Sequence, residues 1–311
     1  MNKTVLIVVG VIVLGAGVYF LSTGSSSKMA MDTNDSMMGM SEEMMASMQV
    51  ATDREFIEGM IPHHQEAVDT AREVLVRGGE IPAIRALAQS IIGSQEEEIA
   101  MMKTWYEDWY GTPYQDTGRY MNMMRPLASY SGRELDQVFT KDMIVHHQGA
   151  VMMAEMALKF SERDEIRDLS DAIIESQQRE IALMQAVLDD APEQTLSVEV
   201  NDRKLEPSVV TVTEGDVVTL SVATDESGEF HISGYEIENA MEVGEMLEFA
   251  LLADKPGRYN FELHPTAVEG KEGHDEEETQ AWLPFINVAE ASEGEEGEED
   301  IVIGAFVVNP R

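Results

Sequence analysis

Apolar residues between positions 51 and 191 recur at the three- and four-residue spacing of amphipathic helices. Thr52-Asp-Arg-Glu55 has the pattern of a capping box, and Pro82 suits the first turn of a helix. Two stripes with this spacing are Ile84, Leu87, Ile91, Gln95, Glu98, Met102 and Phe139, Met143, His146, Ala150, Met153, Ala157. The pattern predicts two helical hairpins that pack as a four-helix bundle over residues 51–191, linked by residues 103–130.

The bundle region is an internal repeat, with units at 51–110 and 131–190. Residues 56–67 recur 83 positions later, and residues 91–102 recur 82 positions later. The one-residue difference falls between these segments, where a loop tolerates a change in length. Both copies keep a Met-x-x-His-His-Gln motif followed by Glu and Met, so these positions are candidates for a shared function.

After Pro192 the pattern changes to the alternation of half-exposed strands. Residues 196–200 and 217–222 are predicted strands, and Glu214-Gly215-Asp216 marks a turn between strands. The pattern predicts a β-sandwich over residues 192–311, interrupted by an acidic insertion at 265–300.

The amino-terminal segment carries Lys3 and an apolar run at residues 5–21. This pattern predicts a signal anchor or transmembrane helix in residues 1–24, with the remaining domains outside the cytoplasm in the cell envelope. If the segment is cleaved, the protein is secreted. Residues 25–50 form a predicted Met-rich, disordered tether. Its thioethers could wrap Cu(I), or the stretch could pack on the bundle, and the sequence leaves both interpretations open.

The composition excludes some classes of partner and of metal site. With 59 Asp and Glu against 21 Lys and Arg, the formal charge is −38, which excludes nucleic acid as an expected partner because phosphates are repelled. The absence of cysteine excludes disulfides, thiolate zinc sites and a blue-copper thiolate. The chain instead holds 22 Met, the soft ligand that remains when Cys is absent.

A metal centre is the main hypothesis for the bundle. Met60 lies three and four residues before His63 and His64, so a thioether and an imidazole share one helix face. Pseudo-twofold packing is expected to bring together the candidate ligands of both copies, which are His63, His64, His146, His147, Met60, Met143, Glu98, Glu180, Met102 and Met184. The competing interpretation is that Met fills the core and His makes structural hydrogen bonds, but duplication of the whole motif favours metal binding.

The two Met-Ile-x-His-His-Gln-x-Ala segments and the two Ser-Gln-x-x-Glu-Ile-Ala-x-Met segments resemble the secreted family known as domain of unknown function 305. The resemblance covers roughly residues 51–190. It implies a ferritin-like four-helix bundle and, for some members, copper binding and copper tolerance. Carried over by position, the signature residues of the family are His63, His64, His146, His147, Glu98 and Glu180.

Residues 193–311 resemble a cupredoxin-like sandwich, in which His231 and His264 match positions of copper-site histidines. The chain lacks the cysteine of an electron-transfer site, and no Met follows His264 in the closing loop. The resemblance therefore leaves two readings: a His-pair site for Cu(II) or another ion, and a sandwich kept only for docking or structure.

These observations favour an extracytoplasmic copper-binding protein, with Cu(I) preferred, that acts in storage, delivery or tolerance rather than in catalysis. Another transition metal, a copper-handling protein partner and self-association are further hypotheses. One alternative is a ferritin-like di-metal oxidase, which needs Glu-x-x-His motifs that the His-His pairs lack. The other is a structural or interaction module without metal.

Overall fold

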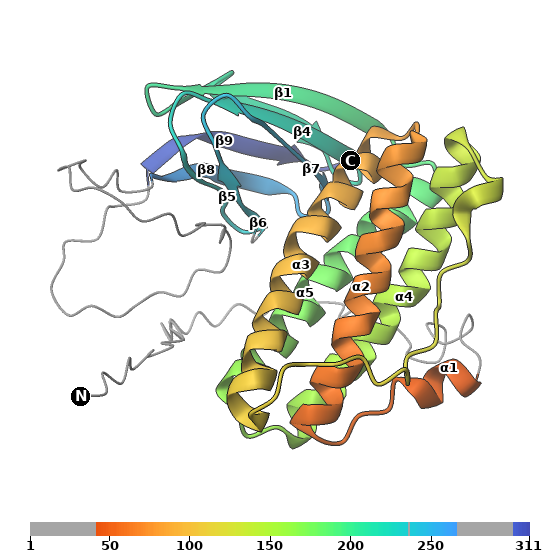
Figure 1. Cartoon of the computed structure of the whole chain (residues 1–311). Coiled ribbons are helices and arrows are strands. Elements are labelled where there is room, and N and C mark those ends of the chain that lie inside the picture. Colours follow the sequence, from red (N-terminus) through yellow and green to blue (C-terminus); the bar gives the residue numbers. More distant parts are fainter. Residues whose placement is uncertain (1–41, 236, 266–300) are drawn as a thin grey trace, which may run out of the picture.

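The computed structural model describes residues 42–235, 237–265 and 301–311, in which a helical bundle precedes a β-sandwich (Figure 1). The predicted anchor at 1–24, most of the predicted tether and residues 266–300 of the acidic insertion lie outside this described part. Among the described residues, no helix has the length and apolar character needed to span a bilayer.

Four long helices form the bundle, pairing as the hairpins α2/α3 and α4/α5, with α2 packed on α4. The helices are α1 Glu42–Ser47, α2 Asp53–Arg77, α3 Pro82–Tyr110, α4 Gly132–Phe160 and α5 Asp164–Leu188, with a 3₁₀ turn η1 at Leu127–Ser129. The four long helices lie within the segments that the apolar periodicity predicts, except that α3 continues to Tyr110, into the predicted linker 103–130.

The helix ends follow local chemistry. Thr52 Oγ1 accepts the backbone N–H of Glu55 at 3.2 Å, and the Glu55 carboxylate accepts the N–H of Ala51 at 3.0 Å, which confirms the capping box. Helix α2 ends at Gly78 in the left-handed region, with φ 78°, whereas α4 ends at Ser161 in extended backbone. Because the two helices end differently, the loop of the first hairpin spans residues 78–81 and that of the second spans residues 161–163. The first loop is one residue longer, which accounts for the one-residue difference in offset between the repeated segments.

The end of the predicted tether is ordered against the bundle. Residues 42–47 form α1, and Met48 and Val50 are buried in the same apolar cluster as Phe56 and Ile57 of α2. This part of the chain therefore differs from the expected disordered tether and follows the packing interpretation. The physical reason is that the apolar groups of Met48 and Val50 leave water by covering the bundle surface.

The bundle core is divided into two apolar clusters by a polar layer. One cluster, near α1, contains Phe56, Met60, Ile99, Met102 and Ile173 among others. The second, near the sandwich, contains other residues of the same four helices, among them Val74, Leu87, Phe139, Met143 and Met184. Between them each helix contributes buried polar side chains, which are His63, His64, Gln95, His146, His147 and Gln177.

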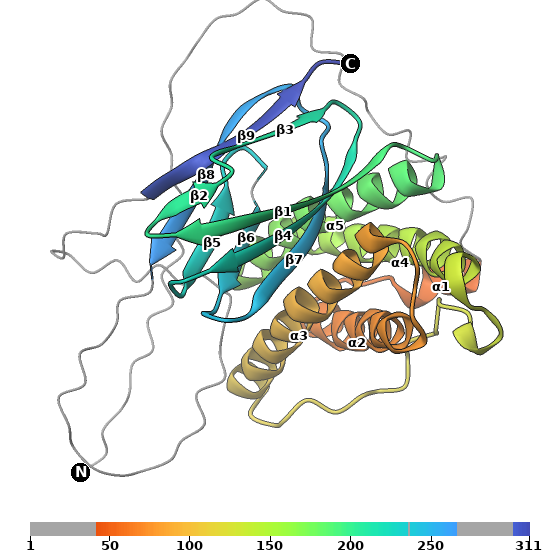
Figure 2. The ribbon, with the colours of Figure 1, turned by 90° about the horizontal axis from the view of Figure 1, so that it is seen from above.

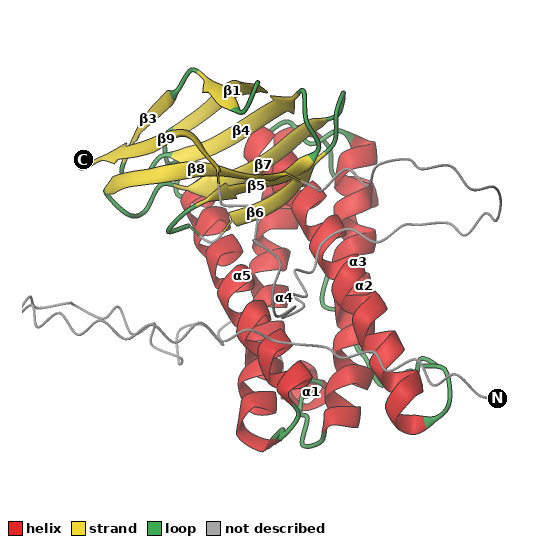
Figure 3. Cartoon of the chain, turned by 90° about the vertical axis from the view of Figure 1, so that its left-hand side faces the viewer, coloured by secondary structure: helices red, strands yellow, loops and turns green. Residues whose placement is uncertain are grey.

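Nine strands of the described residues form two packed sheets (Figures 2 and 3). One sheet has the order β2-β1-β4-β7 and the other β3-β9-β8-β5-β6. The strands are β1 Glu193–Asn201, β2 Lys204–Glu206, β3 Val209–Thr213, β4 Val217–Thr224, β5 Gly228–Ile232, β6 Ile237–Met241, β7 Met246–Leu252, β8 Gly257–Pro265 and β9 Ile301–Asn309. The pairs β1/β4 and β3/β9 are parallel, and the other paired strands are antiparallel.

The bundle docks on the outer face of the four-stranded sheet, where α3 and α5 contact β4 and β7 (Figure 3). Val217 of β4 is fully buried in the bundle's apolar cluster, with Ala250 and Leu252 of β7 packed against it. Val218 and Leu220 of the same strand β4 point instead into the sandwich core. Strand β4 is therefore buried on both faces, between the core of the sandwich and the apolar cluster of the bundle.

Candidate metal centre

Four histidines occupy the middle of the bundle. His63 and His64 come from α2, His146 and His147 come from α4, and all four side chains are fully buried. Adjacent histidines point about 100° apart around a helix, so each pair presents one imidazole to the facing helix and one sideways. The structure thus brings together all four histidines that the repeated motif singles out.

The facing imidazoles touch across the bundle. The ring centroids of His63 and His146 lie 3.7 Å apart, with the ring planes tilted by 40°. Neither ring nitrogen of His63 has a hydrogen-bond partner among the described residues, and neither does Nδ1 of His146. An unpaired buried polar group costs about 1–3 kcal/mol, so these nitrogens need a partner that the described side chains do not supply.

The sideways imidazoles each meet a carboxylate from the other helix of the same hairpin. His64 Nε2 lies 2.6 Å from Glu98 Oε2, and His147 Nε2 lies 2.6 Å from Glu180 Oε2. The structure therefore brings both predicted Glu residues to histidines, one pair in each repeat. A carboxylate on one nitrogen fixes the orientation of an imidazole and raises its basicity as a ligand.

The facing histidines are held in the neutral form. Burial is the main cause that lowers the pKa of His146 to about 4, and burial together with the nearby His146 lowers the pKa of His63 well below its usual value. A neutral imidazole has a free lone pair, which is the form that binds a metal ion. Burial alone would raise the pKa of Glu66, but hydrogen bonds from His146, Tyr120 and the Met123 amide hold it below its usual value.

The two facing histidines have different neighbours, because the repeat is broken at one position. Glu66 corresponds to Gly149 in the second copy. Glu66 Oε2 lies 3.5 Å from His146 Nε2, whereas a Cβ on Gly149 would lie 3.1 Å from His63 Nε2 and 2.5 Å from Met48 Sδ. The space that a side chain at 149 would take is thus used by the Met48 thioether, which lies beside His63. The Met123 methyl lies 3.5 Å from the same point.

The side of the histidine layer that carries Glu66 and Tyr120 adjoins a surface cleft. Tyr120 from the linker donates a hydrogen bond to Glu66 and lies 3.3 Å from His146 Nε2. Glu66 and Tyr120 also line a cleft of about 480 Å³ between α2 and the linker. Glu73, Asp69 and Asp116 line the same cleft, as do Lys103 and Arg125, so carboxylates outnumber basic groups there and favour the approach of cations.

The four methionines predicted from the motif lie above and below the histidine layer. Met60 and Met102 are fully buried in the apolar cluster near α1, and Met143 and Met184 are fully buried in the cluster near the sandwich. Their positions match the core-filling interpretation, and their assignment as ligands stays a prediction.

Sequence reasoning missed Glu66, Tyr120 and Met123 as members of this centre, and it assigned Met48 to the thioethers of the tether rather than to a position beside His63. Glu66 is not part of the repeated motif, because its counterpart in the second copy is Gly149. The signal that could have identified it is the asymmetry itself, since the motif continues as Gln-Glu in one copy and Gln-Gly in the other. The linker residues Tyr120 and Met123 lie outside the repeat, so periodicity gives no signal for them.

His231 and His264, predicted in the sandwich, lie on adjacent strands β5 and β8 with ring centroids 5.9 Å apart. Both side chains are partly exposed. They belong to the sandwich and not to the bundle, so they form a pair separate from the four bundle histidines.

A duplicated helical bundle with a buried histidine layer, followed by a sandwich, defines the class of this protein. The chain belongs to the family described as domain of unknown function DUF305, whose profile matches residues 15–106 and 53–188. Residues 176–271 match the cupredoxin-like domain. A comparison with curated proteins gave no match.

Solved structures of similar sequence cover the bundle. CopM in the Cu(I)-bound form is 41% identical over 45% of this chain and 98% of CopM, with a TM-score of 0.41. CopM has also been solved in Cu(II)-bound and Ag-bound forms, each 40% identical. A DUF305 protein from Streptomyces coelicolor is 27% identical over 44% of this chain and 92% of its own length, with a TM-score of 0.41.

Proposed function

We propose that the bundle binds Cu(I) at a centre built around His63, with Met48 and His146 as the nearest further donors. The observation that carries the proposal is the convergence of Met48 Sδ and His63 Nε2 at Gly149. Met48 Sδ lies 2.5 Å and His63 Nε2 lies 3.1 Å from the position that a Cβ on Gly149 would take. Both atoms are therefore close enough that one ion can bridge them after rotation of the two side chains.

The donor set suits a soft, singly charged ion. Thioether sulfur is soft, imidazole nitrogen is intermediate, and both are neutral, so binding Cu(I) buries only one charge. The fully buried His63 has its nitrogens available, because its pKa is lowered by burial. An ion of higher charge would meet a larger desolvation penalty in the same place.

We propose that the protein stores or delivers copper, or confers tolerance to it, outside the cytoplasm. CopM, 41% identical over the bundle, is described with Cu(I), Cu(II) and Ag, so copper is the first metal to test and silver is its redox-inert substitute. We propose that the ion approaches through the acidic cleft, because Glu66 and Tyr120, which line it, lie 3.5 and 3.3 Å from His146 Nε2. Lys3 and the apolar run at 5–21 support the extracytoplasmic placement.

The experiment is an anaerobic Cu(I) titration against a chromophoric competitor, using the soluble chain from residue 25. Met48→Leu keeps the volume and removes the sulfur, and the expected result is at least about tenfold weaker binding, the loss of one metal donor contact. Met153→Leu is the matched control, because Met153 is equally buried in the same apolar cluster and is not a candidate ligand. Unchanged affinity in both Met48→Leu and His63→Gln would overturn the proposal.

A di-metal oxidase is the second candidate, because Glu66, Glu98 and Glu180 each approach a histidine of the layer. A di-metal centre needs carboxylates shared by two ions, and in the described residues no three His, Asp or Glu ligand atoms of the bundle lie within 4.8 Å of one another. Iron-dependent oxidation activity retained by Met48→Leu and lost by Glu98→Gln would favour this alternative.

A further inference from the structure

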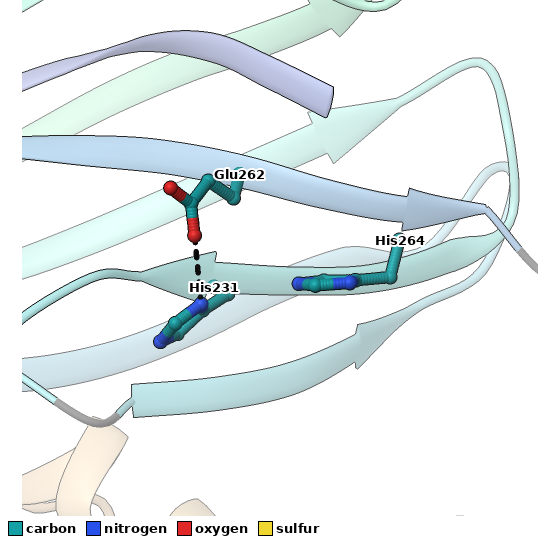
Figure 4. Close-up of side chains that lie close together, drawn as sticks. All are labelled: His231, Glu262 and His264. Atoms are coloured by element: carbon teal, nitrogen blue, oxygen red, sulfur yellow. Dashed lines mark hydrogen bonds and ion pairs between the residues drawn. The ribbon is translucent and has the colours of Figure 1, made fainter. Parts of the chain in front are cut away.

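Three potential ligands lie together on the outer face of the five-stranded sheet (Figure 4). His231 of β5 is the register partner of Glu262 on β8, and His264 is two residues farther along β8. Side chains alternate between the faces of a strand, so the three share one face. Phe230 and Leu263, on the opposite face, are fully buried in the sandwich core.

The three side chains converge closely. One ligand atom from each, two imidazole nitrogens and one carboxylate oxygen, lie within 4.8 Å of one another. His231 Nδ1 is 3.1 Å from Glu262 Oε2. Two donors on one tetrahedral ion lie roughly 3.4 Å apart, given metal–nitrogen distances of about 2.1 Å, so small rotations of these side chains complete the geometry.

The positions of the three ligands are fixed by the sheet. Strands β5 and β8 are interior strands of their sheet, each hydrogen-bonded on both sides. Asn260 Nδ2 donates to Glu262 Oε1 at 3.1 Å, which orients the carboxylate. His231 Nε2 is buried without a hydrogen-bond partner among the described residues. A fixed backbone with an oriented carboxylate lowers the entropy that an ion must overcome to bind.

We propose that His231, Glu262 and His264 form a second site, for a divalent ion of intermediate softness. Two imidazoles and one carboxylate suit Cu(II) and Zn(II), and Cu(II) binds the more tightly of the two on general affinity order. The anionic carboxylate and partial exposure to water offset the charge of a divalent ion. Side-chain exposures are 14% for His231 and 13% for Glu262, which leaves a coordination position open to water.

This site is not the electron-transfer site of a cupredoxin. Its three ligands lie on the outer face of the sheet, and none of them is a thioether or a thiolate. One ligand, Glu262, is not among the residues that the resemblance to cupredoxins indicates, which are His231 and His264. It differs from the proposed Cu(I) centre in donor type, burial and domain. The protein therefore has separate places for the two oxidation states of copper, and either proposal can fail without the other.

The test is a Cu(II) titration of the soluble chain under air, monitored by electron paramagnetic resonance. The expected result is one equivalent with an axial signal and nitrogen hyperfine structure. Glu262→Gln is expected to weaken binding about tenfold or more, and the double variant His231→Gln/His264→Gln is expected to lose the signal. Zn(II) is expected to compete for the same equivalent.

Glu199→Gln is the matched control, because Glu199 is an exposed strand carboxylate that also accepts a side-chain N–H from an asparagine two residues away, Asn201. It is expected to leave Cu(II) binding unchanged. Thermal unfolding of the metal-free variants checks that the sandwich is folded, and the anaerobic Cu(I) titration checks that the bundle centre is intact. Equal Cu(II) affinity for Glu262→Gln and Glu199→Gln, or a signal that survives in the double variant, would overturn the second site.

Discussion

At the scale of single residues, the chemistry of the bundle depends on where the two repeats differ. Four histidines follow from the sequence because the motif is kept in both copies. The partners of the facing pair do not follow, because Glu66 and Gly149 occupy equivalent positions and only a three-dimensional structure shows that Met48 uses the space beside Gly149. A comparison of the two repeats identifies the residues that both copies keep, but not the residues by which the two histidine environments differ.

Gly149→Ala tests this difference directly. The added Cβ would lie 2.5 Å from Met48 Sδ, so we expect it to displace the thioether and weaken Cu(I) binding about tenfold, comparably to Met48→Leu. Gly93→Ala on α3 is the control, because nothing lies within 4 Å of its Cβ, and it is expected to stabilise the helix by about 0.5–1 kcal/mol. Competitive titration of both variants makes the comparison, and equal affinities would contradict the role of Gly149.

The buried imidazoles also predict how stability depends on pH. Burial lowers the folded pKa of His146 from 6.5 to about 4, so the unfolded chain binds more protons below pH 6.5. The stability contributed by neutral His146 is full above pH 6.5 and is lost as pH falls towards 4. Urea unfolding of metal-free protein at pH 7.5 and 5.5 measures the loss, and His146→Gln is expected to reduce it. An unchanged pH dependence in that variant would contradict the prediction.

At the scale of elements, periodicity predicts the four long helices and their caps, because each presents an apolar stripe to one core. Periodicity does not predict helix α1, because six residues are too few to show a helical period. Its position comes instead from tertiary contacts of Met48 and Val50. Short elements ordered by a neighbouring surface are generally hidden from sequence patterns.

The junction of the two hairpins depends on one carboxylate. Asp136 of α4 is fully buried, and its Oδ2 accepts the backbone N–H groups of Glu80 and Ile81 at 2.7 and 2.8 Å, where α3 begins. Asp136→Ala leaves these donors unpaired, and we expect a loss of about 1–3 kcal/mol in the free energy of unfolding. Chemical denaturation measures it, with exposed Asp171→Ala of α5 as the control. A loss no larger than that of the control would show that water replaces Asp136.

At the scale of the whole molecule, the sequence predicts two domains but not their docking. The apolar run of β4 is compatible with an ordinary buried strand, and only the structure shows that one face packs on the sandwich core and the other on the bundle. The surfaces that meet come from α3, α5, β4 and β7, which no local pattern links.

Docking through β4 predicts coupled unfolding of bundle and sandwich. Val217→Ala removes fully buried apolar surface at the junction, and we expect a loss of about 2 kcal/mol. Tryptophan fluorescence and far-ultraviolet circular dichroism are expected to show one shared transition, and two of the three tryptophans, Trp105 and Trp109, lie on α3. Val209→Ala on β3, where the side chain is 41% exposed, is the control. Two separate transitions in the unmodified protein would mean that the domains fold independently.

The place of Met48 in the chain has a consequence for kinetics. The histidines of the centre sit on long helices, so their departure from an ion requires a bundle helix to open. Met48 follows a helix of six residues and belongs to neither repeat, so its departure leaves the four long helices in place. Local opening of such a short segment is fast compared with opening of the core. For an ion bound as proposed, we therefore expect the dissociation rate to be set by Met48 at the edge of the fold, where an acceptor can take the ion while the bundle stays closed.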